Sequence, residues 1–290
     1  SANDYTIQLT IESDQGCLDS LTKAVTIYPM PKAQFTTDTT RLCERGNVFA
    51  IDYQGGISSG SISKLWSFGD GVFSTTADDT TKSYSTFGSY PVRLELVSGF
   101  DCRDTTEQIL TVHAQPKAQF TIDDSLECFR DHEIVAINKS TLAQGAVQSR
   151  TWTTDGKDYL NIDTLNQAYP SANDYTIQLT IESDQGCLDS LTKAVTIYPM
   201  PKAQFTIDDS LECFRDHEIV AINKSTLAQG AVQSRTWTTD GKDYLNIDTL
   251  NQAYPSANDY TIQLTIESDQ GCLDSLTKAV TIYPMPKAQF

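Results

Sequence analysis

The 290-residue sequence has few of the residues on which catalytic sites and membrane spans depend. It contains three histidines, no Ser/His/Asp arrangement stands out, and HExxH and paired CxxC motifs are absent, so triad hydrolase and zinc chemistry are not indicated. No apolar run approaches the length of a membrane-spanning helix. Lys and Arg are scarce, 21 against 38 Asp and Glu, giving a net charge of −17. Such a charge repels nucleic acid and anionic membranes, so we expect neither nucleic acid as a partner nor membrane insertion.

The sequence also has no initiator Met and no signal peptide, and it begins and ends at the same phase of an internal repeat. We therefore expect it to be part of a longer mature protein.

The repeat itself is the most informative feature that is present. Residues 116–200 and 201–285 are identical, and residues 31–115 are a diverged copy that opens with the same Pro-Lys-Ala-Gln-Phe. An engineered array, or a repeat averaged from a filament, would also give identical copies, but the diverged copy favours a natural array. Enzymes gain little from a second identical active site, whereas a chain that must be long gains from every copy. The repeat therefore predicts a spacer or fibre.

The repeat sets the expected domain boundaries. We expect the C-terminal part of a domain at 1–30, complete domains at 31–115, 116–200 and 201–285, and the start of another at 286–290. Short linkers led by proline separate them, at Pro31, Pro116, Pro201 and Pro286. Because the first 30 residues hold only the last two strands of a domain, their apolar side chains are expected to lack a covering layer.

Each repeat has the pattern of short strands. Tyr90, Val92, Leu94 and Leu96 alternate with other residues, as expected of a half-buried strand. Further strands are predicted at 49–53, 64–68, 108–113 and 195–198, with Gly- and Asp-rich turns between them. About seven such strands around a buried tryptophan (Trp66, Trp152 or Trp237) predict an all-β tandem array of immunoglobulin-like β-sandwich domains.

One segment resembles a known family. Trp66-Ser67-Phe68-Gly69-Asp70-Gly71, followed by Tyr84, Gly88, Tyr90 and Val92, is similar to the WxFGDG and YxxxGxYxV signature of PKD domains. The motif is shorter in the other repeats, where Trp152 and Trp237 begin WTTDG. The resemblance implies that the tryptophans are core residues. The Gly-Cys-x-Asp sequence resembles PKD arrays of giant surface proteins in gliding and predatory Bacteroidetes.

The cysteines are evenly placed. Three pairs lie 59 residues apart within a repeat, and Cys17 is left over, which indicates disulfides and an oxidising exterior. Pairing within each repeat and free or interchain thiols both remain open. The topology of a sandwich favours inter-domain pairs, because the A–B loop and the F–G tip lie at opposite ends. The favoured pairs are Cys43–Cys187 and Cys128–Cys272.

No catalytic, cofactor-binding or metal-binding residues are assigned. Calcium is the one ligand considered, through loop acids at Asp123, Asp124 and Glu127 or at Asp155, Asp158 and Asp163, although ordinary turn residues explain them as well. Asp131-His132-Glu133 is interpreted as a solvated edge rather than a metal site. An Asp-Ser/Thr pattern resembles a Bacteroidetes O-glycosylation motif, with turn enrichment as the alternative; its hydroxyls are Thr39, Thr80, Thr105, Ser125, Thr164 and Ser190.

Together these features predict a non-enzymatic, extracellular structural repeat of a cell-surface filament or adhesin, used for attachment, gliding or prey capture. Its expected partners are neighbouring repeats of the same chain and parallel copies of itself in a multi-chain filament. The alternative is an array of polysaccharide- or protein-binding modules, and a third possibility is an array accessory to a secreted hydrolase.

Overall fold

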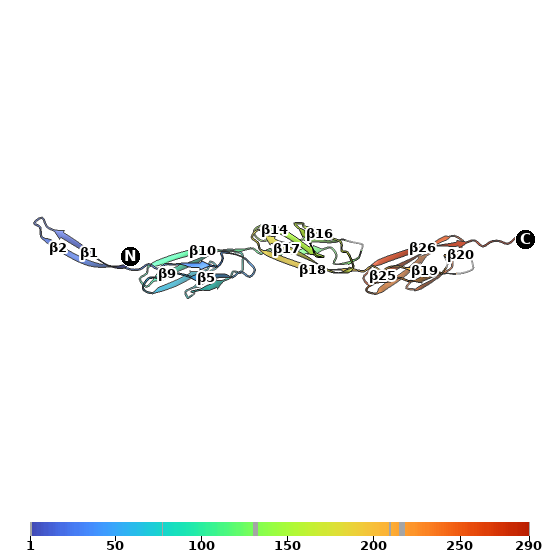
Figure 1. Ribbon diagram of the computed structural model, residues 1–290, viewed down its shortest axis with the longest axis horizontal. Coiled ribbons are helices and arrows are strands. Elements are labelled where there is room, and N and C mark those ends of the chain that lie inside the picture. The colour runs from blue at the N-terminus through green and yellow to red at the C-terminus, as the bar shows by residue number, and fades with distance from the viewer. Residues whose placement is uncertain (1, 77, 130–132, 209, 215–217, 290) are drawn as a thin grey trace. The chain divides into compact units, whose positions relative to one another are not determined.

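A computed structural model describes residues 2–76, 78–129, 133–208, 210–214 and 218–289. Within these ranges the regular secondary structure is β-strand throughout, which confirms the all-β expectation (Figure 1). None of the described residues belongs to a helix that could cross a membrane.

The chain divides into two compact units. One contains Ser1–Ala118, Ser140–Ser149 and Thr180–Asp189, and the other contains Gln119–Lys139, Arg150–Leu179 and Ser190–Phe290. Repeat 31–115 lies in the first unit and repeat 201–285 in the second.

The N-terminal segment forms a two-stranded hairpin, the blue end of the ribbon in Figure 1. Its strands β1 (Asn3–Glu12) and β2 (Leu18–Ile27) pair antiparallel over their full length. Ile7 and Leu9 are 61% and 63% exposed, whereas the identical Ile177 and Leu179 of the second repeat are fully buried. The apolar face of this hairpin is therefore uncovered, because the strands that cover it in a complete repeat are not part of residues 1–30.

Repeat 31–115 is a sandwich of two sheets. A three-stranded sheet has the order β3-β5-β8, and a five-stranded sheet has the order β4-β10-β9-β6-β7. The strands are β3 (Phe35–Thr37), β4 (Arg41–Cys43), β5 (Phe49–Tyr53), β6 (Ile62–Ser67), β7 (Phe73–Ser74), β8 (Thr80–Lys82), β9 (Gly88–Ser98) and β10 (Arg103–His113). The strand expected at 49–53 has these bounds, and the one expected at 108–113 is the second half of β10.

The other two repeats have the same strand order. Repeat 116–200 contains β11 (Phe120–Ile122), β12 (Leu126–Cys128), β13 (Ile134–Asn138), β14 (Val147–Thr154), β15 (Lys157–Leu160), β16 (Thr164–Gln167), β17 (Asn173–Ser183) and β18 (Leu188–Tyr198). Repeat 201–285 contains β19 (Phe205–Ile207), β20 (Leu211–Cys213), β21 (Ile219–Asn223), β22 (Val232–Thr239), β23 (Lys242–Leu245), β24 (Thr249–Gln252), β25 (Asp259–Ser268) and β26 (Leu273–Tyr283).

Each core is built around its tryptophan. Trp66, Trp152 and Trp237 are fully buried, and each packs edge-on against the phenylalanine of the repeat's first strand. In repeat 201–285 the indole Nε1 of Trp237 also donates a hydrogen bond of 2.9 Å to the carbonyl of Ile247. Because a buried indole needs a partner for its N–H, this contact fixes the ring in one orientation.

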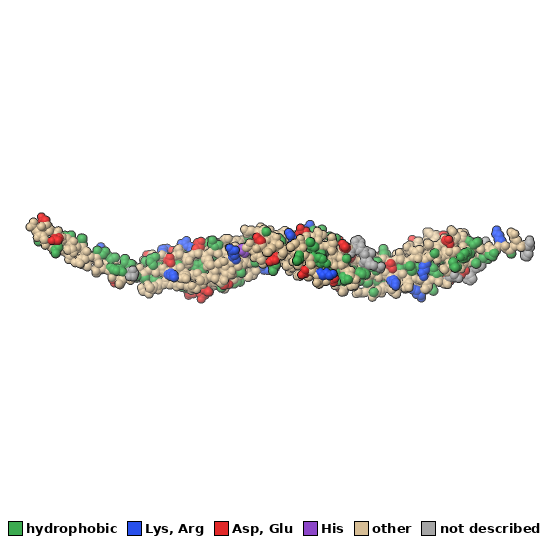
Figure 2. Space-filling view, turned by 45° about the horizontal axis from the view of Figure 1, so that its top comes forward, with side chains coloured by type: hydrophobic (Ala, Val, Ile, Leu, Met, Phe, Trp, Pro, Cys, Tyr) green, Lys and Arg blue, Asp and Glu red, His purple; other side chains and the backbone are tan. Residues whose placement is uncertain are grey.

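Strand alternation explains the sandwich. Along β9, Val92, Leu94 and Leu96 are fully buried, and the residues between them lie on the other face. Acidic and basic side chains are dispersed over the face shown in Figure 2, and they do not gather into one patch there.

Candidate functional site

Two disulfides join consecutive repeats, each within one compact unit. Cys43 bonds Cys187 in the first unit, and Cys128 bonds Cys272 in the second. Each closes a separation of 144 residues with a Cα–Cα distance of 5.6 Å, well inside the range that disulfides allow. The first cysteine of each pair ends a short strand, β4 or β12, and the second lies between the last two strands of the following repeat. We refer to these two places as the strand half and the tip half of the junction.

The strand half depends on a parallel pairing that the sequence analysis did not include. β4 runs parallel to β10, with Cys43 opposite His113, and β12 runs parallel to β18, with Cys128 opposite Tyr198. A three-residue strand is too short to give a periodicity signal, so local sequence could not reveal it.

The tip half is a tight turn. In the second repeat, Gly186 has a φ of 77°, which favours glycine, and the Ser183 Oγ accepts a hydrogen bond of 3.1 Å from the Cys187 amide. The Ser183 amide donates in turn to the Cys187 carbonyl at 2.9 Å. Cys187 is 1% exposed, so the turn presents the sulfur in a fixed and protected position.

An ion pair accompanies the first disulfide. The Arg45 guanidinium lies 2.9 Å from Asp189 Oδ1, and Asp189 Oδ2 accepts a hydrogen bond of 2.8 Å from the Ala118 amide. The Gln115 side chain also donates to the Leu188 carbonyl. The Asp189 carboxylate thus binds both the preceding repeat, through Arg45, and the start of its own repeat, through Ala118. An Asp two residues after each tip cysteine recurs in every copy. This recurrence was the feature of the sequence that could have indicated the role of Asp189 at the junction.

The linkers are held by backbone contacts to the repeat that follows. Lys117 and Thr141 exchange two hydrogen bonds, of 2.8 and 3.0 Å, as do Lys202 and Thr226. Pro116 and Pro201 are buried. Each linker is therefore part of the sandwich it leads into rather than a free tether.

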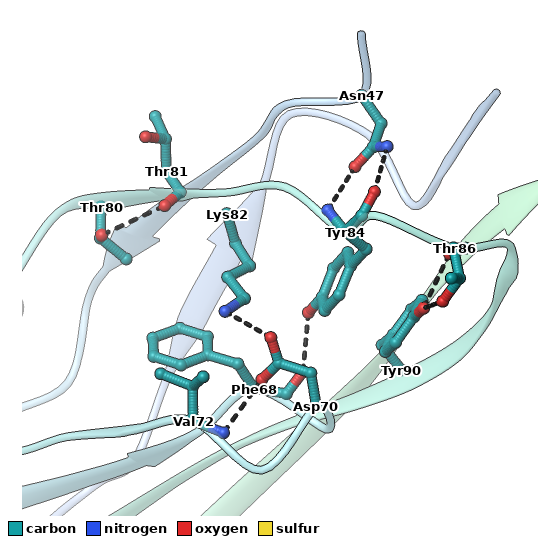
Figure 3. A network of polar contacts seen from close by, with 10 residues as sticks. All are labelled: Asn47, Phe68, Asp70, Val72, Thr80, Thr81, Lys82, Tyr84, Thr86 and Tyr90. Carbon is teal, nitrogen blue, oxygen red and sulfur yellow. Dashed lines mark hydrogen bonds and ion pairs between the residues drawn. The ribbon is translucent and has the colours of Figure 1, made fainter. Parts of the chain in front are cut away.

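The PKD-like turn of repeat 31–115 carries a polar network that is shown in Figure 3. Lys82 Nζ lies 2.6 Å from Asp70 Oδ2, the Val72 amide donates to Asp70 at 3.1 Å, and the Tyr84 hydroxyl donates to the Phe68 carbonyl at 2.7 Å. Burial alone would raise the pKa of Asp70, but the hydrogen bonds from Lys82 and Val72 outweigh it and lower that pKa. Burial raises the pKa of Tyr84 far above its usual range. The network stabilises the turn of the motif.

The identical repeats keep the tyrosine but change its partner. Tyr169 and Tyr254 hydrogen bond to Thr154 and Thr239, at 2.9 Å each, and Gln167 stands where repeat 31–115 has Lys82. The shortened motif thus preserves the core tyrosine without the charged pair.

We predict that Asp70→Asn destabilises repeat 31–115 by about 1 kcal/mol at neutral pH. Because the folded-state pKa of Asp70 is lowered, its contribution is complete above the unfolded-state pKa and is lost as the pH falls through the folded-state value. The difference between variant and parent should therefore vanish in acid. Urea unfolding at several pH values measures it, with Asp155→Asn, in the equivalent turn without a lysine, as the control. A difference that persists in acid would contradict the assignment.

Four of the six acids considered for calcium have contacts with neighbouring groups. Asp123 Oδ1 accepts hydrogen bonds from the amides of Asp124 and Val135, and Asp124 accepts from Leu126. Asp158 accepts from Thr153, and Asp163 pairs with Arg150 at 3.2 Å. Among the described residues no three His, Cys, Asp or Glu side chains are placed to share an ion. Asp131 and His132, read as a solvated edge, lie outside the described residues.

The Asp residues of the O-glycosylation pattern also bind backbone amides. Asp38 accepts from Ala50, Asp104 from Ala33 and Asp79 from Tyr53, at 2.9, 2.7 and 3.0 Å. Thr39 and Thr80 are half-buried, and the other four hydroxyls are exposed: Thr105, Ser125, Thr164 and Ser190. The pattern therefore has a structural role at several of its positions.

Comparison with known proteins places these repeats in context. No family model matches the chain. Over 180 residues it is 26% identical to pre-pro-metalloprotease PrtV of Vibrio cholerae serotype O1, an alignment that covers 61% of this chain and 18% of PrtV. The chain thus spans less than a fifth of that relative's length.

Two solved structures complete the comparison. The PKD1 domain of Vibrio cholerae PrtV is 32% identical over 29% of this chain and 96% of that domain, with a TM-score of 0.25. The eight N-terminal Ig domains of Down Syndrome Cell Adhesion Molecule are 12% identical over 98% of this chain and 40% of that one, with a TM-score of 0.54. The chain is therefore a tandem array with an immunoglobulin-like fold whose repeats are similar to PKD domains.

Proposed function

We propose that the chain is a non-enzymatic, extracellular spacer: a rod of PKD-like repeats within a cell-surface filament or adhesin used for attachment, gliding or prey capture. The observation that carries the proposal is the disulfide between each repeat and the next. A cross-link inside one domain protects that domain, whereas a cross-link between domains resists their separation under load. A spacer needs the second property.

Two further features support this function. The linkers are bound to the repeats that follow them, so little chain is left to act as a hinge. Disulfides persist in oxidising surroundings such as the cell exterior, which favours an extracellular site.

The test removes one repeat without altering any junction. Deleting residues 116–200 joins Gln115 to Pro201, a sequence identical to the natural Gln115–Pro116 junction. For a rod, small-angle scattering should show a maximum dimension shorter by roughly 35–45 Å, the length of one sandwich, with the cross-section unchanged. A change in cross-section with little change in length would show that the repeats fold side by side, and would overturn the proposal.

We predict that chelating agents leave the melting temperature of the array unchanged. Four of the six loop carboxylates considered for calcium are engaged with backbone amides, a hydroxyl or Arg150: Asp123, Asp124, Asp158 and Asp163. We therefore expect that folding needs no ion to neutralise them. Thermal unfolding in EDTA, compared with unfolding in excess CaCl2, measures this. Stabilisation that saturates with calcium would contradict the prediction.

The exposed hydroxyls Thr105, Ser125, Thr164 and Ser190 are the proposed O-glycosylation positions. Intact-mass measurement of protein from its natural source, followed by peptide mapping, tests the assignment. Peptides that are unmodified at all four positions would contradict the O-glycosylation assignment.

The similarity to a metalloprotease favours one second candidate, an array of binding modules accessory to a secreted hydrolase. Cavities of about 380 and 300 Å³ recur at equivalent positions, one beside His113 and Gln144 and the other beside Tyr198 and Gln229. Glycan arrays probed with the full chain distinguish the candidates, since saturable binding would favour the module.

A further inference from the structure

Two of the repeat junctions carry a tyrosine at the same position, and at one of them a second ring covers it. Tyr28 is the sequence equivalent of Tyr198, and Phe100 is the equivalent of Gln270. Tyr28 and Phe100 stack with their ring centroids 3.9 Å apart and an angle of 10° between the ring planes. The tyrosine that precedes this linker is therefore covered by a ring from the tip of the repeat that follows.

At the Tyr198 junction a cavity lies where this covering ring would be. Gln270 stands in the place of Phe100, and a cavity of about 300 Å³ is lined by Tyr198, Gly230 and Gln270 among other residues of the same compact unit. A methyl group placed on Gly60, the equivalent of Gly230, would lie 3.7 Å from the Phe100 ring. Phe100 thus occupies the space that is equivalent to this cavity.

The strand half of the two junctions has the same sequence, because residues 171–200 repeat the first thirty residues. Thr196 Oγ1 donates to Asp174 Oδ1 at 2.7 Å, and the equivalent Thr26 donates to Asp4 over the same distance. The tip half alone therefore decides whether the tyrosine is covered by a ring or faces a cavity.

Polar side chains line much of the rest of the Tyr198 cavity. The carboxylates of Asp174 and Asp269 accept hydrogen bonds, and the side-chain amides of Gln229 and Gln270 both donate and accept them. Both amide side chains are exposed, so a ligand can reach them. The described residues that line this cavity include no Lys or Arg. The cavity therefore combines one aromatic face with groups that bind hydroxyls, and its charge is negative.

We propose that the Tyr198 cavity binds one ring of an uncharged saccharide, which stacks on Tyr198 as Phe100 stacks on Tyr28. The C–H groups on one face of a sugar ring are weakly positive, and they pack well on the negative face of an aromatic ring. The sugar hydroxyls find acceptors in the carboxylates and both donors and acceptors in the amides. The carboxylates repel acidic sugars. Such a site rests on the binding-module candidate above, and a spacer could carry it or lack it.

The His113 junction has a related cavity with different chemistry. Its volume is about 380 Å³, and His113 and Gln185 line it in place of Tyr198 and Gln270. Arg41 also lines this cavity and adds a positive charge. Because the larger aromatic face is replaced there by an imidazole, we expect the neutral saccharide to bind at the Tyr198 junction only.

The experiment measures saccharide binding to the full chain by isothermal titration calorimetry. The neutral probes are the tetrasaccharides of glucose, mannose, galactose and N-acetylglucosamine, each with its monosaccharide, and tetragalacturonic acid is the charged probe. At least one neutral probe should bind at one site per chain, and the charged probe should bind about tenfold more weakly. A tetrasaccharide that binds more tightly than its monosaccharide identifies a polysaccharide as the source of the ring, and equal affinities identify a free sugar.

Three variants locate the site. Tyr198→Ala should weaken binding about tenfold, whereas Tyr198→Phe keeps the stacking ring and should stay within about threefold of the parent chain. Gln270→Phe supplies the ring that Phe100 supplies at the Tyr28 junction, so the variant should fold with an unchanged melting temperature and lose saccharide binding. His113→Ala, the matched truncation at the other cavity, should change the affinity less than about twofold.

Each part of the proposal has its own contrary result. If no neutral probe binds the folded parent chain, both the site and the binding-module candidate fail, and the spacer function is unaffected. If binding survives both Tyr198→Ala and Gln270→Phe, the site alone fails, because the saccharide is then bound elsewhere. An equal loss for His113→Ala would also overturn the site, since it would show a general disturbance of the junctions. Equal affinity for tetragalacturonic acid would overturn the choice of an uncharged sugar.

Discussion

Pulled from its two ends until every domain has unfolded, the oxidised chain is expected to reach less than half the length of the reduced chain. The disulfides Cys43–Cys187 and Cys128–Cys272 overlap in sequence. The shortest covalent path therefore runs from the N-terminus to Cys43, across to Cys187, backwards to Cys128, and across to Cys272. About 120 residues then bear the load, roughly 400 Å of extended chain against about 1,000 Å when both bonds are reduced.

The overlap gives this prediction a sharp variant. Replacing Cys128 and Cys272 by Ser leaves one bond, and the load-bearing path lengthens by only about 26 residues, or roughly 90 Å. Replacing Cys43 and Cys187 should have the same effect. Disulfides closed within single repeats would instead release about 59 residues, roughly 200 Å, for each bond removed. Single-molecule force spectroscopy separates these values, in chains whose free cysteines are replaced by Ser so that no other bond forms.

Trp237→Ala is expected to destabilise repeat 201–285 by about 3–5 kcal/mol. The side chain is fully buried, packs edge-on against Phe205 at 5.1 Å between ring centroids, and donates to the Ile247 carbonyl. Truncation leaves a cavity and removes the indole donor from the Ile247 carbonyl. A loss of this size is a large part of the 5–15 kcal/mol that typically holds a domain together. Denaturant unfolding should show a separate, earlier transition for this repeat.

Matched variants isolate the cause. Leu245→Ala changes a residue on the neighbouring strand β23 that is 64% exposed, so its effect should be within about 0.5 kcal/mol. Trp237→Phe keeps an aromatic ring against Phe205 but removes the indole N–H. Its loss in free energy of unfolding should therefore lie between the losses for Leu245→Ala and Trp237→Ala. The contrary result would be a Trp237→Ala variant in which repeat 201–285 unfolds together with the other repeats in one transition. That result would show that the repeats are a single cooperative unit, and the assignment of the effect to one core would fail.

Short-range patterns in the sequence predicted those parts of the fold that depend on neighbouring residues. The alternation of Val92, Leu94 and Leu96 identified β9, and its buried face agrees with the structure. β4, β12 and β20 were missed because three residues form no period, and each exists only by pairing with a strand far along the chain.

The candidate site shows the same division. The sequence alone determined the repeat, the all-β class and the set of cysteines, since these follow from composition and spacing. Cysteine spacing alone left bonds within and between repeats open, and only the expected ends of the sandwich favoured the inter-repeat pairs Cys43–Cys187 and Cys128–Cys272. The tertiary structure bonds Cys43 to Cys187, pairs Arg45 with Asp189 and leaves Cys17 and Cys213 exposed. These contacts join residues up to 144 positions apart, and such pairs are specified by the packing of whole sandwiches rather than by any local run of residues.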